Sequence, residues 1–215
     1  MGLDQVTSVL AVRHGETAWN RETRIQGQLD IPLSPLGAAQ ARRLAQALDG
    51  QGVDVIYASD LARALQTAEA VAQQLGLAVQ LEPGLRERGF GLFEGLTWAE
   101  IETRWPAESE RWRRRDPQFA AQGGESLQDF YARAVAAVEA LASRHPGQTV
   151  LIVAHGGVLD CLYRAAARQS LQAGRTWTLG NASINRLLYS QTGLTLVGWN
   201  DDNHLAGLSL DDTAA

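Results

Sequence analysis

The sequence predicts a three-layer α/β/α sandwich with a largely parallel central sheet. Short apolar, β-branched runs alternate along the chain with amphipathic helical patterns. Two of these runs end in histidine followed by glycine, in "SVLAVRHG" and in "QTVLIVAHGG". Alternation of strands and helices is typical of parallel sheets with helices on both faces and right-handed crossovers. We therefore expect a single domain of this class over residues 1–215.

The first half of the chain predicts three strands separated by two helices. Ser34 is suited to the N-cap of the first helix, with Pro35 at its first helical position. Asp60 is expected to cap the second helix, and Gly76 to end it. Glycine and proline then make the region after the third strand irregular. In chain order, the elements are expected at 8–12, 35–49, 53–59, 61–75 and 77–82.

The second half predicts an insertion followed by a return to the α/β pattern. Residues 88–124 contain two short helical patterns and three of the six tryptophans, and we expect them to lie over one end of the sheet as a substrate cover. At least one of these tryptophans is expected to pack the insertion onto the body instead. Helices and strands are then expected at 125–144, at 148–154, from Val158 onward, at 184–190 and at 194–200.

Charge argues against nucleic acid as the main partner. The chain has 24 acidic and 19 basic residues, a net charge of −5, and every basic residue is arginine. The one basic cluster, "RWRRRD" at 111–116, is flanked by acids, and its arginines are expected to lie on a solvated helix face. The absence of lysine reflects either selection for guanidinium groups that grip oxyanions or a genome rich in arginine codons, and we favour the second explanation.

Cysteine usage and hydropathy favour a cytoplasmic protein. The single cysteine, Cys161, excludes an intramolecular disulfide and lies in an apolar stretch typical of a buried thiol. No run of about 18 apolar residues suggests a membrane span. The N-terminal "MGLDQVTSV" has neither the charged region nor the apolar region of a secretory signal. We expect no membrane partner.

The two His-Gly strand ends predict an oxyanion site. Ligands of open α/β sheets bind at the carboxyl ends of the strands, so His14 and His155 are expected to face one pocket. Gly156 follows His155 and opens a helix, whose free amides suit an anion. Arg13, and Arg63 on the next helix, add two guanidinium forks that suit a tetrahedral phosphate.

Positive charge around a histidine favours its neutral form, which can act as a nucleophile. One histidine is therefore expected to attack phosphorus and the other to neutralise the transferring group. A leaving alkoxide also needs a proton, and four carboxyl groups lie near the sheet edge. Glu87 is the first choice because it follows the third strand in a glycine-rich loop. The other candidates are Glu16, Glu94 and Glu125.

Four motifs in order resemble the histidine phosphatase superfamily, in its phosphoglycerate mutase-like branch. They are "RHGET", "SDLARALQTAE", "LRERGFGLFEG" and "AHGG", and the resemblance runs from Val9 to about Leu205. It implies the phosphoglycerate mutase-like α/β/α fold, with no metal and no cofactor. It also suggests a homodimer by analogy.

The resemblance implies roles for particular residues. His14 matches the nucleophile that becomes phosphohistidine, and Glu87 matches the proton donor. Arg13, Arg63 and His155 match the phosphate pocket. Three further positions match residues that border the phosphate or substrate in relatives, although two of them, the asparagine and the glutamine, could equally stabilise their own loop. These positions are Asn20, Gln26 and Gly27.

The expected activity is hydrolysis of a small-molecule phosphomonoester to an alcohol and inorganic phosphate. The aromatic insertion resembles that of broad-specificity phosphatases more than the longer basic insertion of cofactor-dependent phosphoglycerate mutases. A mutase and an α-ribazole phosphate phosphatase remain alternatives. Two other classes are disfavoured: an inactive phosphate-binding module, because every expected group is present, and a metalloenzyme, because the arginines would repel a cation.

Overall fold

The computed structural model describes residues 6–208 and contains one six-stranded sheet flanked by helices. The prediction that the N-terminal segment is not a secretory signal concerns, in part, residues 1–5, which lie outside the described residues. The elements are β1 (Thr7–Arg13), α1 (Ala18–Arg21), α2 (Pro35–Leu48), β2 (Val55–Ala58), α3 (Ala62–Leu75), β3 (Val79–Leu81), α4 (Trp98–Arg104), α5 (Pro106–Arg113), α6 (Leu127–Ala142), β4 (Thr149–Ala154), α7 (Gly156–Ala166), β5 (Ile184–Ser190) and β6 (Gly193–Asp201).

The sheet has the strand order β3-β2-β4-β1-β5-β6. The first four strands in this order are parallel. At the other edge, β5 pairs antiparallel with both β1 and β6. In the pairing of β1 with β4, Arg13 lies opposite Ala154. His14 follows β1 and His155 follows β4, so this register brings the two His-Gly strand ends together. The predicted largely parallel sheet is confirmed, with an antiparallel edge.

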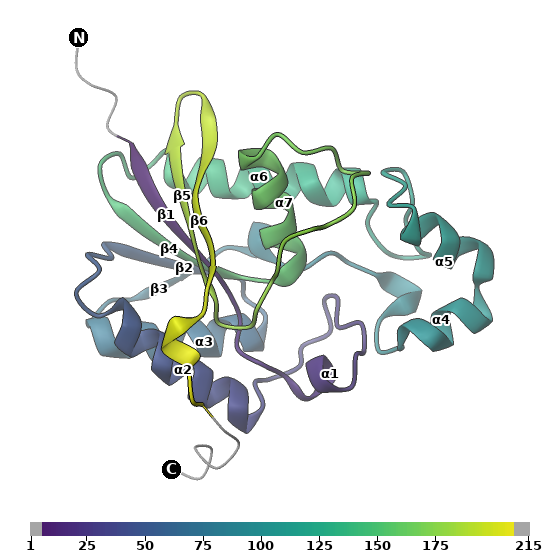
Figure 1. Cartoon of the computed structure of the whole chain (residues 1–215), viewed down its shortest axis with the longest axis horizontal. Helices are drawn as coiled ribbons and strands as arrows, with labels where there is room; N and C mark the ends of the chain where they lie inside the picture. Colours follow the sequence, from purple (N-terminus) through teal and green to yellow (C-terminus); the bar gives the residue numbers. More distant parts are fainter. Residues whose placement is uncertain (1–5, 209–215) are drawn as a thin grey trace.

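The central strands are buried on both faces, which explains their continuous apolar runs. Alternate residues of β1 point to opposite sides: Val9 and Ala11 join a core with α6 and α7, while Leu10 and Val12 join a core with α2 and α3. Figure 1 shows α2 and α3 on one side of the sheet and α6 and α7 on the other. The predicted three-layer sandwich is confirmed.

Of the two predicted N-caps, the one at Ser34 is confirmed and the one at Asp60 is wrong. Ser34 caps α2 as expected, since its side chain accepts from the Gly37 amide. Asp60 does not cap α3, because Leu61 occupies the N-cap position and the Asp60 carboxylate instead pairs with Arg86. Asp30, from a distant loop, accepts the Ala62 amide at 2.6 Å. A tertiary contact thus replaces the expected local cap.

Helix α7 begins at Gly156, two residues earlier than expected, with His155 at its N-cap position. The early start matters for the site, because the first amides of a helix have no partner within the helix. Both glycines of "HGG" therefore lie in the first turn, directly at the sheet edge. Gly157 leaves no room for a side chain, since a Cβ there would lie 2.1 Å from Glu87 Oε1.

The segment that holds α4 and α5 has a small core of its own and stands at one end of the molecule (Figure 1). Phe93, Ile101 and Phe119 are buried in it, with Trp105 and Trp112 packed against them. Two of the three tryptophans thus pack within the segment, consistent with a structural role for at least one. Within residues 6–208, no helix has the length and apolar character needed to cross a membrane.

Candidate active site

The carboxyl edge of the sheet brings His14 and His155 side by side. Their ring centroids lie 5.2 Å apart with the ring planes tilted by 58°. Both side chains are buried, with His14 3% and His155 0% exposed. The His14 amide donates to the Ala154 carbonyl at 2.9 Å, which continues the pairing of β1 with β4 into the site. The expected convergence of the two strand ends is therefore present.

Hydrogen bonds orient the two imidazole rings. His14 Nδ1 lies 2.7 Å from the Gly15 carbonyl oxygen. A carbonyl oxygen only accepts, so Nδ1 carries the proton and Nε2 of the neutral ring keeps its lone pair. His155 Nε2 lies 2.9 Å from Ser59 Oγ, and its Nδ1 is buried with no partner among the described residues. His14 is thus the ring whose bonding leaves Nε2 available.

The surroundings keep both histidines neutral. Burial is the largest cause lowering the pKa of His14, followed by the charges of Arg63 and Arg13, and together they place it well below the ordinary value. Burial and the charge of Arg63 lower the pKa of His155 in the same way, with smaller contributions from His14 and Arg13. A neutral imidazole beside two cations is the arrangement that a nucleophile facing a phosphate needs.

The two arginines are held by backbone carbonyls and keep further donors. Arg63 donates through Nη1 to Leu29 O at 2.9 Å and through Nη2 to Gly27 O at 2.7 Å. Arg13 donates through Nη1 to the Leu179 carbonyl. The Nε atoms of both are buried without a partner in the part of the chain that the structure describes. Burial lowers the pKa of Arg63 to about 10, still a cation at neutral pH.

Glu87 is the candidate carboxylate whose partners lie at the site. Its Oε1 accepts the Arg88 amide at 2.8 Å, and its Oε2 accepts the Gly157 amide at 2.9 Å in the first turn of α7. Its charge also acts on Arg13 and Arg63.

The other three candidate carboxylates are engaged in the scaffold. Glu16 accepts from Ser34 Oγ at 2.8 Å. Glu94 accepts the Gln28 amide at 3.0 Å. Glu125 pairs with Arg133 at 2.8 Å. Of the four candidates, Glu87 is the one that is hydrogen-bonded to the first turn of α7.

The remaining predicted phosphate- or substrate-binding residues lie in α1, in the loop that follows it, and at the start of α7. They are Asn20, Gln26, Gly27 and Gly156. Asn20 Oδ1 accepts the Thr17 amide at 3.0 Å in a capping box, so this oxygen stabilises its own loop. Gln26 is buried, and its Oε1 lacks a partner among residues 6–208. Gly27 has φ of +53°, and a Cβ there would meet Glu94 Oε1 at 2.1 Å. Gly156 lines a cavity beside Arg13.

Several residues at the site were not found from the sequence. Ser59 holds His155, Thr67 accepts the Gly15 amide at 3.0 Å, and Asn181 Nδ2 donates to the His14 carbonyl at 2.9 Å. Thr67 lies four residues after Arg63 on α3, and this helical spacing could have indicated it. Asn181 comes from the segment before β5, where no local pattern marks it.

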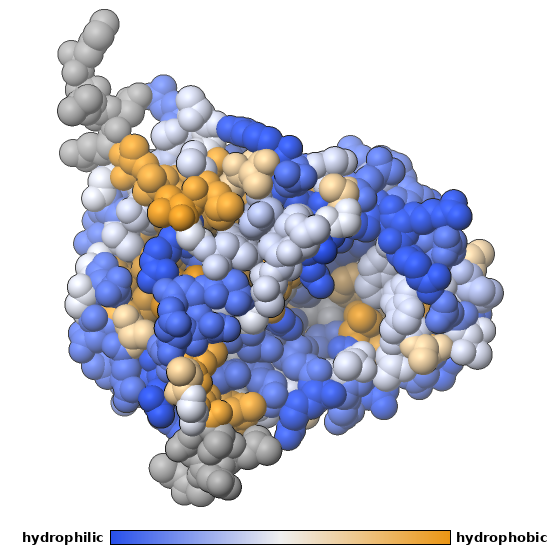
Figure 2. All heavy atoms as spheres, viewed as in Figure 1, coloured by the Kyte–Doolittle hydropathy of each residue, from blue (hydrophilic) through white to orange (hydrophobic). Residues whose placement is uncertain are grey.

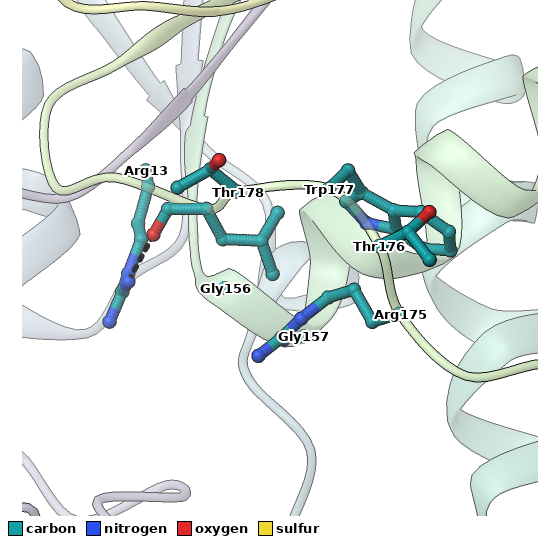
Figure 3. Close-up of a pocket in the computed structure, with 8 residues that line it drawn as sticks. Arg13, Gly156, Gly157, Arg175, Thr176, Trp177 and Thr178 are labelled. Atoms are coloured by element: carbon teal, nitrogen blue, oxygen red, sulfur yellow. Dashed lines mark hydrogen bonds between the residues drawn. The ribbon is translucent and has the colours of Figure 1, made fainter.

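Two cavities share Gly157, in the first turn of α7, as a lining residue. One, of about 590 Å³, lies between Arg13, the first turn of α7 and residues 175–179 (Figure 3). The other, of about 450 Å³, lies between Glu87 and the aromatic side chains Phe90, Trp98 and Trp112. Figure 2 shows the surface hollowed between the body and the end that carries α4 and α5. The space next to Glu87 therefore has an apolar wall.

Arg115 corrects the expectation of a solvated arginine face. Arg113 and Arg114 do pair with glutamates on the surface. Arg115 instead turns inward, donating to Asp160 Oδ2 at 2.8 Å and to Leu171 O at 2.6 Å, with a positive φ of 54°. This turn after α5 lets the side chain connect the insertion to α7. Hydrophobic periodicity could not indicate a residue that leaves the helix.

Metal-binding side chains do not gather in the described residues: no group of three or more histidine, cysteine, aspartate or glutamate side chains could hold an ion there. Cys161 is buried on α7, and burial raises the pKa of its thiol far above the usual range. The histidines outside the pair have structural contacts. His145 Nε2 lies 3.0 Å from the Tyr57 hydroxyl, and His204 Nε2 lies 3.1 Å from the Ala182 carbonyl.

The fold and the site together define an α/β/α protein with a buried histidine pair clamped by arginines. Residues 9–202 match the family model of the histidine phosphatase superfamily (branch 1). The chain belongs to this superfamily. The resemblance predicted from the four motifs is confirmed.

Relatives in the family carry both phosphatase and mutase names. The chain is 38% identical over 213 residues to a "Probable phosphoglycerate mutase GpmB" of Cronobacter sakazakii, covering 95% of this chain and 97% of the relative. It is 36% identical over 207 residues to a "Metal-independent phosphoserine phosphatase" of Arabidopsis thaliana, covering 95% and 85%.

Solved structures share the fold. Bacillus stearothermophilus YhfR superposes with a TM-score of 0.86 at 34% identity, over 93% of this chain and 99% of that one. A phosphoserine phosphatase from Entamoeba histolytica, in complex with 3-phosphoglyceric acid, superposes with a TM-score of 0.83 at 29% identity, over 93% and 99%.

The neutral histidine pair makes stability depend on pH in a predictable direction. In the unfolded chain, histidine takes up a proton below a pH of about 6.5, whereas the lowered pKa values keep His14 and His155 neutral in the fold. The unfolded state then binds more protons, so the free energy of unfolding falls as the pH drops, by up to about 1.4 kcal/mol per pH unit for each histidine.

Denaturant unfolding between about pH 7 and about pH 5 measures this effect. We expect His14→Gln and His155→Gln each to show a shallower fall than the unmodified protein. Equal pH dependence in all three proteins would contradict the neutral pair.

Proposed function

We propose that this protein is a metal-independent phosphatase that hydrolyses small phosphomonoesters through a phosphohistidine on His14. One observation carries the proposal. Nδ1 of His14 is hydrogen-bonded to the Gly15 carbonyl, so Nε2 is unprotonated, and the charges of Arg13 and Arg63 act on this ring. The family match and the phosphatase names among the relatives support hydrolysis as the activity.

In the first step, His14 Nε2 attacks phosphorus and the P–O bond to the alcohol breaks. Arg13, Arg63 and neutral His155 donate hydrogen bonds to the phosphoryl oxygens as charge builds up on them. Glu87, in its acid form, gives its proton to the leaving alkoxide, so the alcohol leaves neutral. The products of this step are the alcohol, a phosphorylated His14 and the Glu87 carboxylate.

In the second step, the Glu87 carboxylate takes a proton from a water molecule, whose oxygen attacks phosphorus. The P–N bond breaks, inorganic phosphate leaves, and His14 and protonated Glu87 are restored. The Gly157 amide keeps the same carboxyl group in place for both steps. The insertion with α4 and α5 serves in this proposal as the substrate cover, and its aromatic wall suits an apolar part of the alcohol.

A phosphoglycerate mutase is the second candidate function. It is favoured by the mutase name of the relative from Cronobacter sakazakii. The same phosphohistidine would then pass its phosphoryl group to a second hydroxyl instead of water. Incubation with phosphoglycerate distinguishes the two: a phosphatase releases inorganic phosphate, and a mutase yields the isomer without release.

Nitrophenyl phosphate with excess EDTA tests the proposed function. We expect turnover that EDTA leaves unchanged, because arginines and histidines supply the electrostatic stabilisation. His14→Ala should abolish turnover, while His145→Ala, which removes a histidine outside the site, should retain it. No turnover by the unmodified protein, loss of activity in EDTA, or activity in His14→Ala would contradict the proposal.

The role of Glu87 predicts a dependence on the leaving group. A nitrophenolate leaves readily without a proton, whereas an alkoxide needs one. In Glu87→Gln, kcat/KM for an alkyl phosphate is expected to fall by about 10²- to 10⁴-fold, and kcat/KM for nitrophenyl phosphate to fall much less. Glu125→Gln is not a clean control because Glu125 pairs with Arg133. An equal fall for both substrates would argue against Glu87 as the acid.

A further inference from the structure

Arg175 has a guanidinium group with no partner in the part of the chain that the structure describes. It lies in the segment between α7 and β5, is exposed, and forms no hydrogen bond or ion pair within residues 6–208. The other arginines around the two cavities are engaged. Arg13 donates to Leu179 O, Arg88 to Glu125 O, and Arg115 to Asp160. Arg175 is therefore the cavity arginine with all of its donors available to a ligand.

Arg175 stands between the phosphate end and the cover end of the site. Gly157 and Arg175 line both the cavity of about 590 Å³ and the cavity of about 450 Å³. Figure 3 shows the Arg175 side chain extending from its segment toward Gly157, on the side of the cavity that Arg13 also faces. Because Arg175 lines both cavities, a substrate that extends from the Arg13 end to the aromatic wall would lie beside this guanidinium.

The backbone next to Arg175 is anchored, so its position is defined. Trp177 stacks on Tyr163 with ring centroids 3.9 Å apart, and the Arg164 guanidinium lies 4.8 Å from the Trp177 ring. Thr178 O accepts from the indole nitrogen of Trp199 at 2.9 Å. These contacts tie the segment to α7 and β6, whereas the Arg175 side chain has no such contact among residues 6–208.

The charge around Arg175 favours an anion. Its positive charge acts on Arg13, whose pKa it helps to lower, after the larger effect of burial. The two nearest carboxylates of the cavities are engaged elsewhere, since Glu87 accepts backbone amides and Asp160 pairs with Arg115 and Arg164. An additional oxyanion would relieve the repulsion between the two guanidinium groups.

We propose that Arg175 is a specificity-determining residue that binds a second anionic group, a carboxylate or a second phosphate, on the alcohol part of the substrate. This inference rests on the proposed hydrolysis at His14. A guanidinium fork binds either oxyanion through two parallel hydrogen bonds. The preferred substrates are then phosphomonoesters of small acids or bisphosphates of small diols, with any apolar part on the aromatic wall.

Matched substrates test the role of Arg175. Phosphoglycerate is compared with glycerol phosphate, which has a hydroxymethyl group in place of the carboxylate. Propanediol bisphosphate is compared with propanediol monophosphate. Arg175→Gln is expected to lower kcat/KM for the member with a second anionic group in at least one pair by about 10- to 100-fold, chiefly through KM. It should change kcat/KM for the members with a single phosphate group less than about threefold. Arg175→Lys, which keeps the charge, should recover part of the loss.

Arg43→Gln is the matched control, because it removes an exposed arginine on α2 outside both cavities. A loss confined to phosphoglycerate identifies a carboxylate ligand, a loss confined to the bisphosphate identifies a phosphate, and both losses identify a general oxyanion site. An equal loss for the members with and without a second anionic group, or no loss for either, overturns the role of Arg175. If the unmodified protein hydrolyses nitrophenyl phosphate but none of the four compounds, the role of Arg175 is overturned and the proposed function stands. If it hydrolyses neither nitrophenyl phosphate nor any of the four compounds, the proposed function itself fails.

Discussion

The parallel pairing of β1 with β4 is the constraint on which the site depends. The register that sets Arg13 opposite Ala154 ends both strands at one level, so His14 and His155 emerge together. The same pairing carries the core, since residues of both strands contribute alternately to the layers above and below the sheet. Slipping one strand by a single residue would exchange its two faces and separate the histidines. Core packing and site geometry are therefore specified by the same hydrogen bonds.

The site concentrates groups that are unfavourable for folding. Arg63 and two neutral histidines are buried at the sheet edge and Arg13 is partly buried, with nitrogen atoms of Arg13, Arg63 and His155 unpaired among the described residues. Such groups cost stability, and the surrounding core offsets that cost. In return, the arrangement is prepared for a ligand that carries the missing negative charge. Loop contacts such as Arg63 with the Gly27 carbonyl hold the cations in place before any ligand arrives.

Features governed by local chemistry could be predicted from the sequence. The buried strands, the Ser34 cap and the Gly76 helix end follow from hydrophobic runs and backbone preferences. The contacts of Asp60 could not be predicted, because they depend on residues from other elements. Arg86 pairs with the Asp60 carboxylate, and Asp30 accepts the amide hydrogen bond at the start of α3 that Asp60 was expected to accept. The same is true of Ser59 and Asn181.

The site divides in a similar way. His14, His155 and their glycines stand at strand ends, where sequence order fixes their location. Arg115 and Arg175 both line the cavity next to Glu87, and Arg115 pairs with Asp160 there. Their positions depend on how the insertion and the segment before β5 pack against the rest of the fold. Charge alone could not separate these arginines from those that pair on the surface.

In the proposed mechanism, the phosphoryl group is transferred to Nε2 of His14 before water releases it. The most direct measurement is to quench the protein in base during turnover, digest it and locate phosphate by mass spectrometry, with Nε2 distinguished from Nδ1 by the phosphorus resonance of the peptide. This mechanism predicts a base-stable, acid-labile phosphate on His14 Nε2. Phosphate on His155 or on another residue, or a protein that remains unphosphorylated while turning over substrate, would contradict it.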